Sequence, residues 1–190
     1  MESKWTLIKQ DIKRYCDNPD YSKVYFPKGE SNACYILKLL IHLFGFRGRN
    51  QCFRTIFYYR LGTIGKIIGK IFPPRYKTTT IDCPHVVGGI YFSHPYGTIL
   101  NCEHIGYGCA FVHNITFGNK YKDGKLCRPY LEDNVHVGAG AIIIGNVHIG
   151  SNVKIGAGTV LTKSVPDNCT VVGNPAKIIM KDGVRVDIPL

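Results

Sequence analysis

The sequence predicts a parallel β-helix that follows a shorter helical segment. Large aliphatic residues recur at every sixth position from Leu131 to Leu161, and small or β-branched residues stand four positions after each of them. Glycine often follows the aliphatic residue directly, where a corner needs unusual backbone angles. A period of six is typical of a solenoid in which each hexapeptide supplies one strand and one corner. Chance periodicity in a chain rich in Val, Ile and Gly is the alternative, and the unbroken run of matches disfavours it.

The same period extends towards the N-terminus. Steps of six back from Phe117 reach only apolar residues, apart from one serine: Phe111, Ile105, Ile99, Ser93, Val87 and Ile81. We therefore expect a solenoid over about residues 81–175. The register slips between Phe117 and Leu131, and the polar stretch 119–129 is expected to leave the coil as a loop of functional importance. A tolerated surface insertion is the other interpretation of that stretch.

The segment 1–80 is basic and helical in pattern. It holds 15 Lys/Arg and 5 Asp/Glu, a net +10, whereas the rest of the chain holds 9 and 8, a net +1. Apolar spacing predicts helices over about 3–16, 33–44 and 50–61. The predicted organisation is a helical segment 1–80, a β-helix domain 81–180 and a C-terminal tail 181–190.

The basic charge is compatible with nucleic acid, an anionic membrane surface or an acidic substrate, and a solvated basic face needs no partner. We expect no nucleic-acid partner. The apolar run 33–44 is too short to span a bilayer. Peripheral membrane contact through residues 1–80 is one interpretation, and packing of that run against the solenoid or a partner subunit is the other. No CxxC motif and no signal-peptide pattern are present, so we expect reduced thiols and a cytoplasmic protein, placed at the inner face of the membrane if the segment anchors.

Two histidines are candidates for acid–base chemistry. His94 stands in Ser93-His-Pro-Tyr-Gly97, where the aliphatic series fails, and His113 follows in Phe111-Val-His-Asn-Ile115. If three hexapeptides make one coil, every third hexapeptide returns the chain to the same corner. The two histidines are separated by three hexapeptides and one further position, so both imidazoles should lie at one edge, one coil apart. Histidine accepts and returns a proton near neutral pH. Two ordinary surface histidines are the alternative.

Several motifs resemble the hexapeptide-repeat acyltransferases, and specifically their serine O-acetyltransferase branch. They are Ser93-His-Pro-Tyr-Gly97, Ile115-Thr-Phe-Gly-Asn119, Val137-Gly-Ala-Gly-Ala141, Ile155-Gly-Ala-Gly-Thr159, Val165-Pro-Asp167 and Val172-Gly-Asn-Pro-Ala-Lys177. The resemblance covers about residues 81–180. It implies a left-handed β-helix, a homotrimer, acetyl-CoA as donor and no metal.

The acceptor positions depart from that branch. The branch has an Asp directly before the catalytic His and an Arg-His pair before a Pro in the loop, whereas this chain has Ser93 and Cys127-Arg128-Pro129. The pattern around His113 is similar to exopolysaccharide O-acetyltransferases of the colanic-acid type. The resemblance therefore leads us to expect acetyl transfer to a sugar hydroxyl in surface polysaccharide biosynthesis. Serine O-acetylation for cysteine biosynthesis is the alternative.

The resemblance also implies roles for individual residues in a direct transfer. His94 would be the general base, His113 would assist or bind the acceptor, and Asp82 or Glu103 would orient the imidazole. Three further residues would contact the acceptor: Ser93, Tyr96 and Arg128. A backbone N–H at Gly118 would stabilise the oxyanion.

The donor would lie along a groove between neighbouring solenoids, near Ala139 and Ala157, where small side chains permit close approach. Lys154 and Lys177 are candidate partners for the phosphates of CoA, with simple solvent exposure as the alternative. Two other classes remain open. A zinc hydratase of the γ-carbonic-anhydrase type would need three converging histidines, and a non-catalytic scaffold would bind no CoA.

Overall fold

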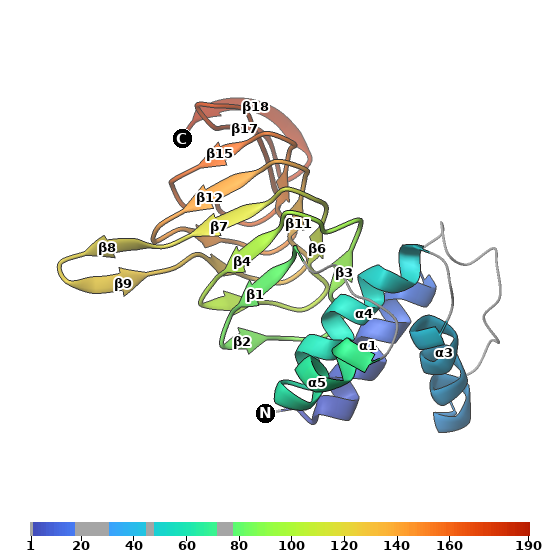
Figure 1. The fold of residues 1–190 in the computed structure, drawn as a ribbon. Coiled ribbons are helices and arrows are strands. Elements are labelled where there is room, and N and C mark those ends of the chain that lie inside the picture. The colour runs from blue at the N-terminus through green and yellow to red at the C-terminus, as the bar shows by residue number, and fades with distance from the viewer. Residues whose placement is uncertain (1, 18–30, 45–47, 72–77) are drawn as a thin grey trace.

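The computed structural model describes residues 2–17, 31–44, 48–71 and 78–190. Within these ranges there are four helices (Figure 1): α1 (Lys4–Asp17), α3 (Asn32–Phe44), α4 (Gly48–Arg60) and α5 (Thr63–Ile71). Helices α1 and α4 contact the first coil of a parallel β-helix, and α3 and α5 pack on α4. The first three helices match the ranges predicted from apolar spacing, and α5 was not predicted. The loop expected up to about residue 31 and the Pro73-Pro74 end of the segment lie outside the described residues.

Three parallel sheets form the walls of the β-helix, which confirms the fold predicted from the six-residue period. The first wall consists of β1 (Thr80–Asp82), β4 (Ile99–Asn101), β7 (Thr116–Gly118), β12 (Ile142–Ile144) and β15 (Val160–Leu161). The second wall consists of β2 (His85–Val86), β5 (His104–Ile105), β10 (Tyr130–Leu131) and β13 (His148–Ile149). The third wall consists of β3 (Tyr91–Phe92), β6 (Ala110–Phe111), β11 (His136–Val137), β14 (Lys154–Ile155) and β16 (Cys169–Val172).

The aliphatic series from Leu131 to Leu161 lines the interior of the coils. Its members are all buried, from 0 to 3% exposed. Val137 pairs with Ile155, and Ile143 pairs with Leu161. Three hexapeptides separate the members of each pair, so three hexapeptides make one coil, as the sequence predicted.

Before residue 105 the series shifts by one position. The inward residues of the first coil are Phe92 and Leu100, which pair with Phe111 and Phe117 of the next coil. Ile99 is instead 45% exposed. The predicted inward positions at residues 99, 93 and 87 are therefore wrong by one residue, since Val86 rather than Val87 pairs with the buried Ile105. Ile81 keeps its predicted position, because it pairs with Leu100. Between Phe92 and Leu100 the chain is two positions longer than a hexapeptide, and the extra length enlarges the corner that contains His94.

The polar stretch after β7 leaves the coil as predicted. Strands β8 (Lys120–Lys122) and β9 (Lys125–Cys127) form an antiparallel hairpin that projects from the solenoid (Figure 1). A second hairpin, β17 (Lys177–Lys181) and β18 (Val184–Pro189), extends the third wall in antiparallel fashion. Residues 181–190, expected as a tail, belong to this hairpin. Asp182 and Gly183 form its two-residue turn with φ of 49° and 79°, the signs that a type I′ turn requires.

A buried ion pair joins the helices to the first coil. Arg60 Nε donates to Asp11 Oδ2 at 3.0 Å, and the same guanidinium donates to the carbonyls of Val86 and Val87. Asp11 also accepts the Ile90 N–H at 2.9 Å. Burial raises the pKa of the Asp11 carboxyl, and the Arg60 charge and hydrogen bonds oppose that rise. Although Asp11 is charged, it is only 1% exposed, because Arg60 and the coil supply polar partners to this side of the helix.

Candidate functional site

One edge of the β-helix collects the predicted general base and the predicted donor-binding alanines. This histidine edge, between the third and first walls, is defined by His94, Tyr96, His113, Ala139 and Ala157. Backbone hydrogen bonds join its successive coils. The N–H groups of residues 114, 140 and 158 donate to the carbonyls of Tyr96, His113 and Ala139 at 2.9, 2.9 and 2.8 Å. The two histidines therefore lie at one corner, one coil apart, as their spacing predicted.

The corners of the histidine edge use left-handed backbone conformations. In three of the four coils the residue with positive φ is Asn114, Gly140 or Gly158. In the first coil both His94 (φ 53°) and Gly97 (φ 62°) adopt it. A non-glycine residue in this region is uncommon and marks a position to examine for function. The His94 ring is exposed at this enlarged corner, and no described residue hydrogen-bonds it.

The His113 ring is fixed by stacking on Tyr96. Their ring centroids lie 4.8 Å apart at an interplanar angle of 17°. His113 is half-buried, and its Nδ1 atom is buried without a hydrogen-bond partner among the described residues. Ser93 is also half-buried, and its N–H donates to the Phe111 carbonyl. The edge thus presents one exposed imidazole beside a second, immobilised one that keeps unused hydrogen-bonding capacity.

A second group of polar residues lies at the opposite border of the first wall. We call this border the arginine edge and define it by Asp82, Asn101 and Arg128. Arg128 Nη2 lies 3.6 Å from Asp82 Oδ2, and the Arg128 side chain is only 21% exposed. Arg128 Nε and Asn101 Oδ1 are buried and have no hydrogen-bond partner among the described residues. The arginine edge therefore holds a cation, a carboxylate and an amide oxygen with capacity to spare for a small zwitterion.

The structure does not bring Asp82 or Gly118 to His94 within one chain. Thr78 Oγ1 accepts the Gly97 N–H at 3.1 Å, so β1 begins beside the His94 corner and runs away from it. Asp82 follows four positions later, about 13 Å along an extended strand. Gly118 ends β7 on the same border as Asp82, and Glu103 also lies there, just after β4. The expected pairing of His94 with either carboxylate is therefore absent from a single protomer.

Asn101 is a site residue that the sequence analysis missed. It is the register partner of Asp82 on the neighbouring strand. The signal was available, because the spacing from Asp82 to Asn101 is the same as the spacing from His94 to His113.

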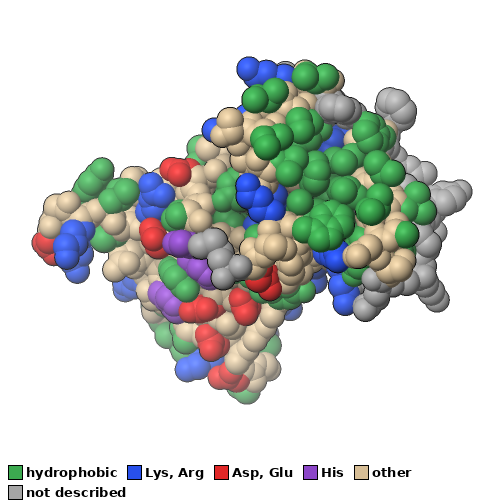
Figure 2. All heavy atoms as spheres, turned by 90° about the horizontal axis from the view of Figure 1, so that it is seen from below, with side chains coloured by type: hydrophobic (Ala, Val, Ile, Leu, Met, Phe, Trp, Pro, Cys, Tyr) green, Lys and Arg blue, Asp and Glu red, His purple; other side chains and the backbone are tan. Residues whose placement is uncertain are grey.

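The outer face of the second wall carries a ladder of flat rings. His104 stacks on Tyr130 at 4.5 Å, and Tyr130 stacks on His148 at 5.2 Å, while His148 Nε2 lies 3.0 Å from Glu132 Oε1. Figure 2 shows histidine side chains among Asp and Glu on the face seen from below.

A groove of about 610 Å³ lies between this wall and helices α1 and α4, and His85 and His104 are among the residues that line it. Across the described ranges, no three His, Cys, Asp or Glu side chains come together as a metal site would require.

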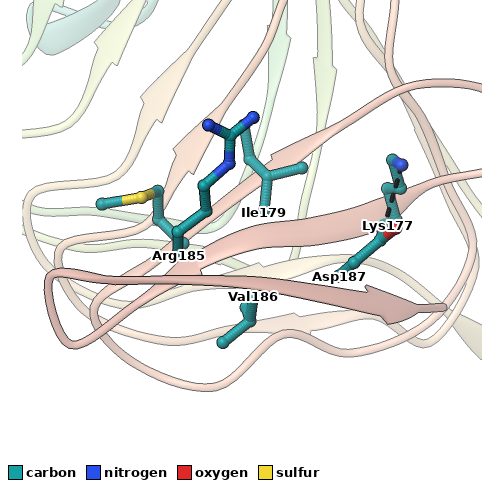
Figure 3. Close-up of a pocket in the computed structure, with 6 residues that line it drawn as sticks. Lys177, Ile179, Arg185, Val186 and Asp187 are labelled. Carbon is teal, nitrogen blue, oxygen red and sulfur yellow. Dashed lines mark ion pairs between the residues drawn. The ribbon is translucent and has the colours of Figure 1, made fainter.

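The two candidate phosphate-binding lysines differ in their surroundings. Lys154 is exposed on β14, and no described carboxylate pairs with it. The pKa of His136 on the adjacent strand is lowered, mainly because the ring is partly buried and further because the charges of Arg14 and Lys154 lie nearby. Lys177 is instead paired with Asp187 at 3.0 Å, beside a pocket of about 300 Å³ between β17 and β18 (Figure 3). Lys154 is thus the better placed of the two to receive a phosphate.

Comparison with known proteins relates the coils to acetyltransferases. Residues 128–163 match the family model described as bacterial transferase hexapeptide (six repeats). A serine acetyltransferase of Synechococcus elongatus is 43% identical over 100 residues, which are 52% of this chain and 41% of the relative. One of Staphylococcus aureus is 39% identical over 99 residues, 51% of this chain and 46% of the relative. The matches thus span less than half the length of these relatives.

Solved structures agree over a longer stretch. The serine acetyltransferase of Neisseria gonorrhoeae superposes with a TM-score of 0.63 at 26% identity, over 96% of this chain and 68% of that one. The soybean enzyme complexed with serine superposes with a TM-score of 0.62 at 26% identity, over 93% and 70%. These matches confirm the left-handed form of the β-helix. They overturn the prediction of a sugar acceptor in polysaccharide biosynthesis, because the matched relatives are named serine acetyltransferases.

Proposed function

From a left-handed hexapeptide-repeat β-helix of the serine acetyltransferase type, we propose that this protein transfers the acetyl group of acetyl-CoA to the hydroxyl of L-serine. The observation that carries the proposal is the pair of Arg128 and Asp82, 3.6 Å apart at the arginine edge. Free serine has one carboxylate and one ammonium group. The Arg128 guanidinium binds the carboxylate, and the exposed Asp82 carboxylate binds the ammonium, with Asn101 on the neighbouring strand beside them.

This charge pair corrects the reasoning that had disfavoured serine. The sequence argument treated Ser93 and the loop Cys127-Arg128-Pro129 as a loss of the groups that hold a zwitterion. The arginine edge supplies both charges, because Asp82 lies beside the loop residue Arg128 in the folded chain. An acceptor that lacks the carboxylate would leave the largely buried Arg128 side chain without that partner, which gives the site its selectivity.

His94 acts as the general base of a direct transfer. Its imidazole takes the serine hydroxyl proton while the oxygen attacks the thioester carbon. The tetrahedral adduct then collapses, the carbon–sulfur bond breaks, and the proton passes from the imidazolium to the departing CoA sulfur. His113, held against Tyr96 one coil from His94, assists the transfer or binds the acceptor.

A site that uses both edges needs a second copy of the chain. The two edges border the first wall, whose outer face carries exposed apolar residues, including Ile99 (45% exposed) and Ile144 (38%). A homotrimer in which three first walls surround the axis would cover these residues. It would also set the histidine edge of one protomer against the arginine edge of its neighbour. Acetyl-CoA would then lie along Ala139 and Ala157, with a phosphate near Lys154.

Mixed trimers test the proposal. His94→Ala and Arg128→Gln should each abolish most transfer to L-serine. Three-fold symmetry leaves one intact pairing in each mixed trimer, so an equal mixture reassembled from subunits should recover roughly a quarter of wild-type activity. Serine methyl ester, which lacks the carboxylate, should be a poor acceptor for the wild type. No transfer to L-serine by the wild type would overturn the acceptor, and no recovery in mixed trimers would overturn the shared site.

A further inference from the structure

Helix α5 packs on α4 through its glycines and leaves its isoleucines outside. A Cβ atom at Gly65 would lie 2.0 Å from the Tyr58 carbonyl oxygen, and one at Gly69 would lie 3.2 Å from the Tyr58 ring. The helix therefore sits as close to α4 as only glycine permits. The exposed residues of its apolar stripe are Ile64 (62%), Ile67 (58%) and Ile71 (77%). An amphipathic helix normally turns this stripe towards the core, and α5 does not.

Helix α3 shows a second apolar stripe of the same kind. Ile36, Leu37, Leu40 and Phe44 share one side of the helix and are between 45 and 49% exposed. Lys38 points elsewhere, and its ammonium lies 5.4 Å from the centre of the Tyr35 ring. Figure 2 shows hydrophobic side chains gathered over the helical part of the molecule. Helices α3 and α5 both pack on α4, and we call their two stripes together the apolar helix face.

The charges beside this face have one sign. Lys66 and Lys70 are exposed on α5, one turn apart and flanking its isoleucines. Helices α3, α4 and α5 contain no Asp and no Glu. Contact between the apolar helix faces of two copies would therefore bring basic side chains together with no acidic partner from these helices. A partner surface with an apolar interior and a negatively charged boundary would match both the apolar stripes and the basic side chains of this face.

We propose that the apolar helix face binds the surface of a membrane that contains anionic lipids. The isoleucines enter the boundary between headgroups and acyl chains, and the lysines extend to the lipid phosphates. Each lysine near an anionic leaflet strengthens binding about fivefold. The contact is peripheral, and in the described ranges no helix has the length and hydropathy to cross a bilayer. This binding is separate from acetyl transfer and would hold whichever acceptor the enzyme uses.

Vesicle flotation with the full chain tests the proposal. Wild-type protein should float with vesicles of phosphatidylcholine and phosphatidylglycerol, more weakly at high salt, and should not float with phosphatidylcholine alone. Lys66→Gln with Lys70→Gln should weaken binding about 30-fold. The matched control is Lys163→Gln, an exposed lysine of the β-helix, which should bind like wild type.

The isoleucine variants separate the apolar contribution from the charge. Ile67→Ser with Ile71→Ser should weaken binding at least tenfold, whereas Val184→Ser, at a residue 64% exposed on β18, should not change it. Both altered isoleucines are exposed, so the thermal unfolding of the variant, followed by circular dichroism, should match wild type. Absence of binding at low salt, equal binding to neutral vesicles, or equal losses in the control variants would overturn the proposal. So would a smaller assembly of the isoleucine variant in sedimentation, because the face would then join copies of the chain.

Discussion

Arg60 Nε lies 3.0 Å from Asp11 Oδ2, and both side chains are buried between α1, α4 and the first coil. The pair ties three parts of the chain together, since Arg60 also donates to the carbonyls of Val86 and Val87. Asp11 accepts from the backbone of Ile90 on the same coil. We call this set of contacts the buried joint between the helical segment and the β-helix. Further hydrogen bonds between the helices and the coil backbone come from Arg14, Tyr15 and Tyr59.

Removal of one partner of this joint should be strongly destabilising. Arg60→Ala leaves the Asp11 carboxyl buried without its counter-charge, and we expect a loss of about 3–5 kcal/mol in the free energy of unfolding. The control is Lys177→Ala, which breaks the exposed pair with Asp187 and should cost less than about 1 kcal/mol. Urea denaturation measures both values. Equal losses in the two variants would show that the buried joint does not hold the helices.

Two neighbouring isoleucines allow the buried interior of the coil and its exposed outer wall to be tested separately. Ile143 is fully buried, and Ile144 is 38% exposed on the first wall. Ile143→Ala should cost about 2–5 kcal/mol through the cavity it leaves. Ile144→Ala should change the unfolding of an isolated subunit little and weaken self-association instead. Sedimentation at several concentrations checks the second point, and an unchanged assembly would argue against the first wall as the trimer interface.

The sequence predicted the coils well because the six-residue period constrains each inward residue directly. The register prediction failed where the chain adds length at a corner. The two extra positions between Phe92 and Leu100 shift the register, and the amino-acid composition gives no sign of them. The sequence analysis also missed α5, whose glycines lower helix propensity yet permit its close approach to Tyr58. Such tertiary contacts override local preference.

For the site, one-coil spacing predicted that His94 and His113 share a corner. It did not predict that Asp82 would lie beside Arg128, because the hairpin β8–β9 changes the distance along the chain from one coil to the next. Residues that meet across such an insertion have no fixed separation in sequence. The residues next to His94 and in the loop therefore do not reveal, from sequence alone, the charge pair of Asp82 and Arg128.

The role of His94 predicts a specific kinetic defect. His94→Ala should lower kcat for serine acetylation by about 10²–10⁴-fold while acetyl-CoA binding stays nearly unchanged, because a general base acts in the transition state. His85→Ala, at an exposed histidine of the second wall, serves as the matched control and should retain activity. Steady-state kinetics and calorimetric titration of acetyl-CoA give the two quantities. Near-wild-type turnover in His94→Ala would rule out this residue as the base.

Buried thiols predict a loss of stability at alkaline pH. Burial raises the pKa of Cys109 from 9.0 to about 12 and that of Cys83 from 9.0 to about 11. The folded state thus keeps protons that the unfolded state releases. The stabilisation is complete below about pH 9 and is lost as the pH rises through 9 towards 11 and 12. Cys109 contributes more than Cys83, because burial raises its pKa further.

Cys83→Ala with Cys109→Ala should lower stability at neutral pH, because both side chains fill the interior, and should flatten its decline above pH 9. Burial of Tyr59, whose pKa rises from 10.0 to about 12, adds to the alkaline loss in both proteins, so the variant keeps a residual slope. Urea denaturation from pH 7 to 11 measures the difference. In the native wild type, both thiols should also resist iodoacetamide at pH 9 and react once the chain is unfolded. Parallel declines of the two proteins above pH 9 would show that other groups control alkaline unfolding.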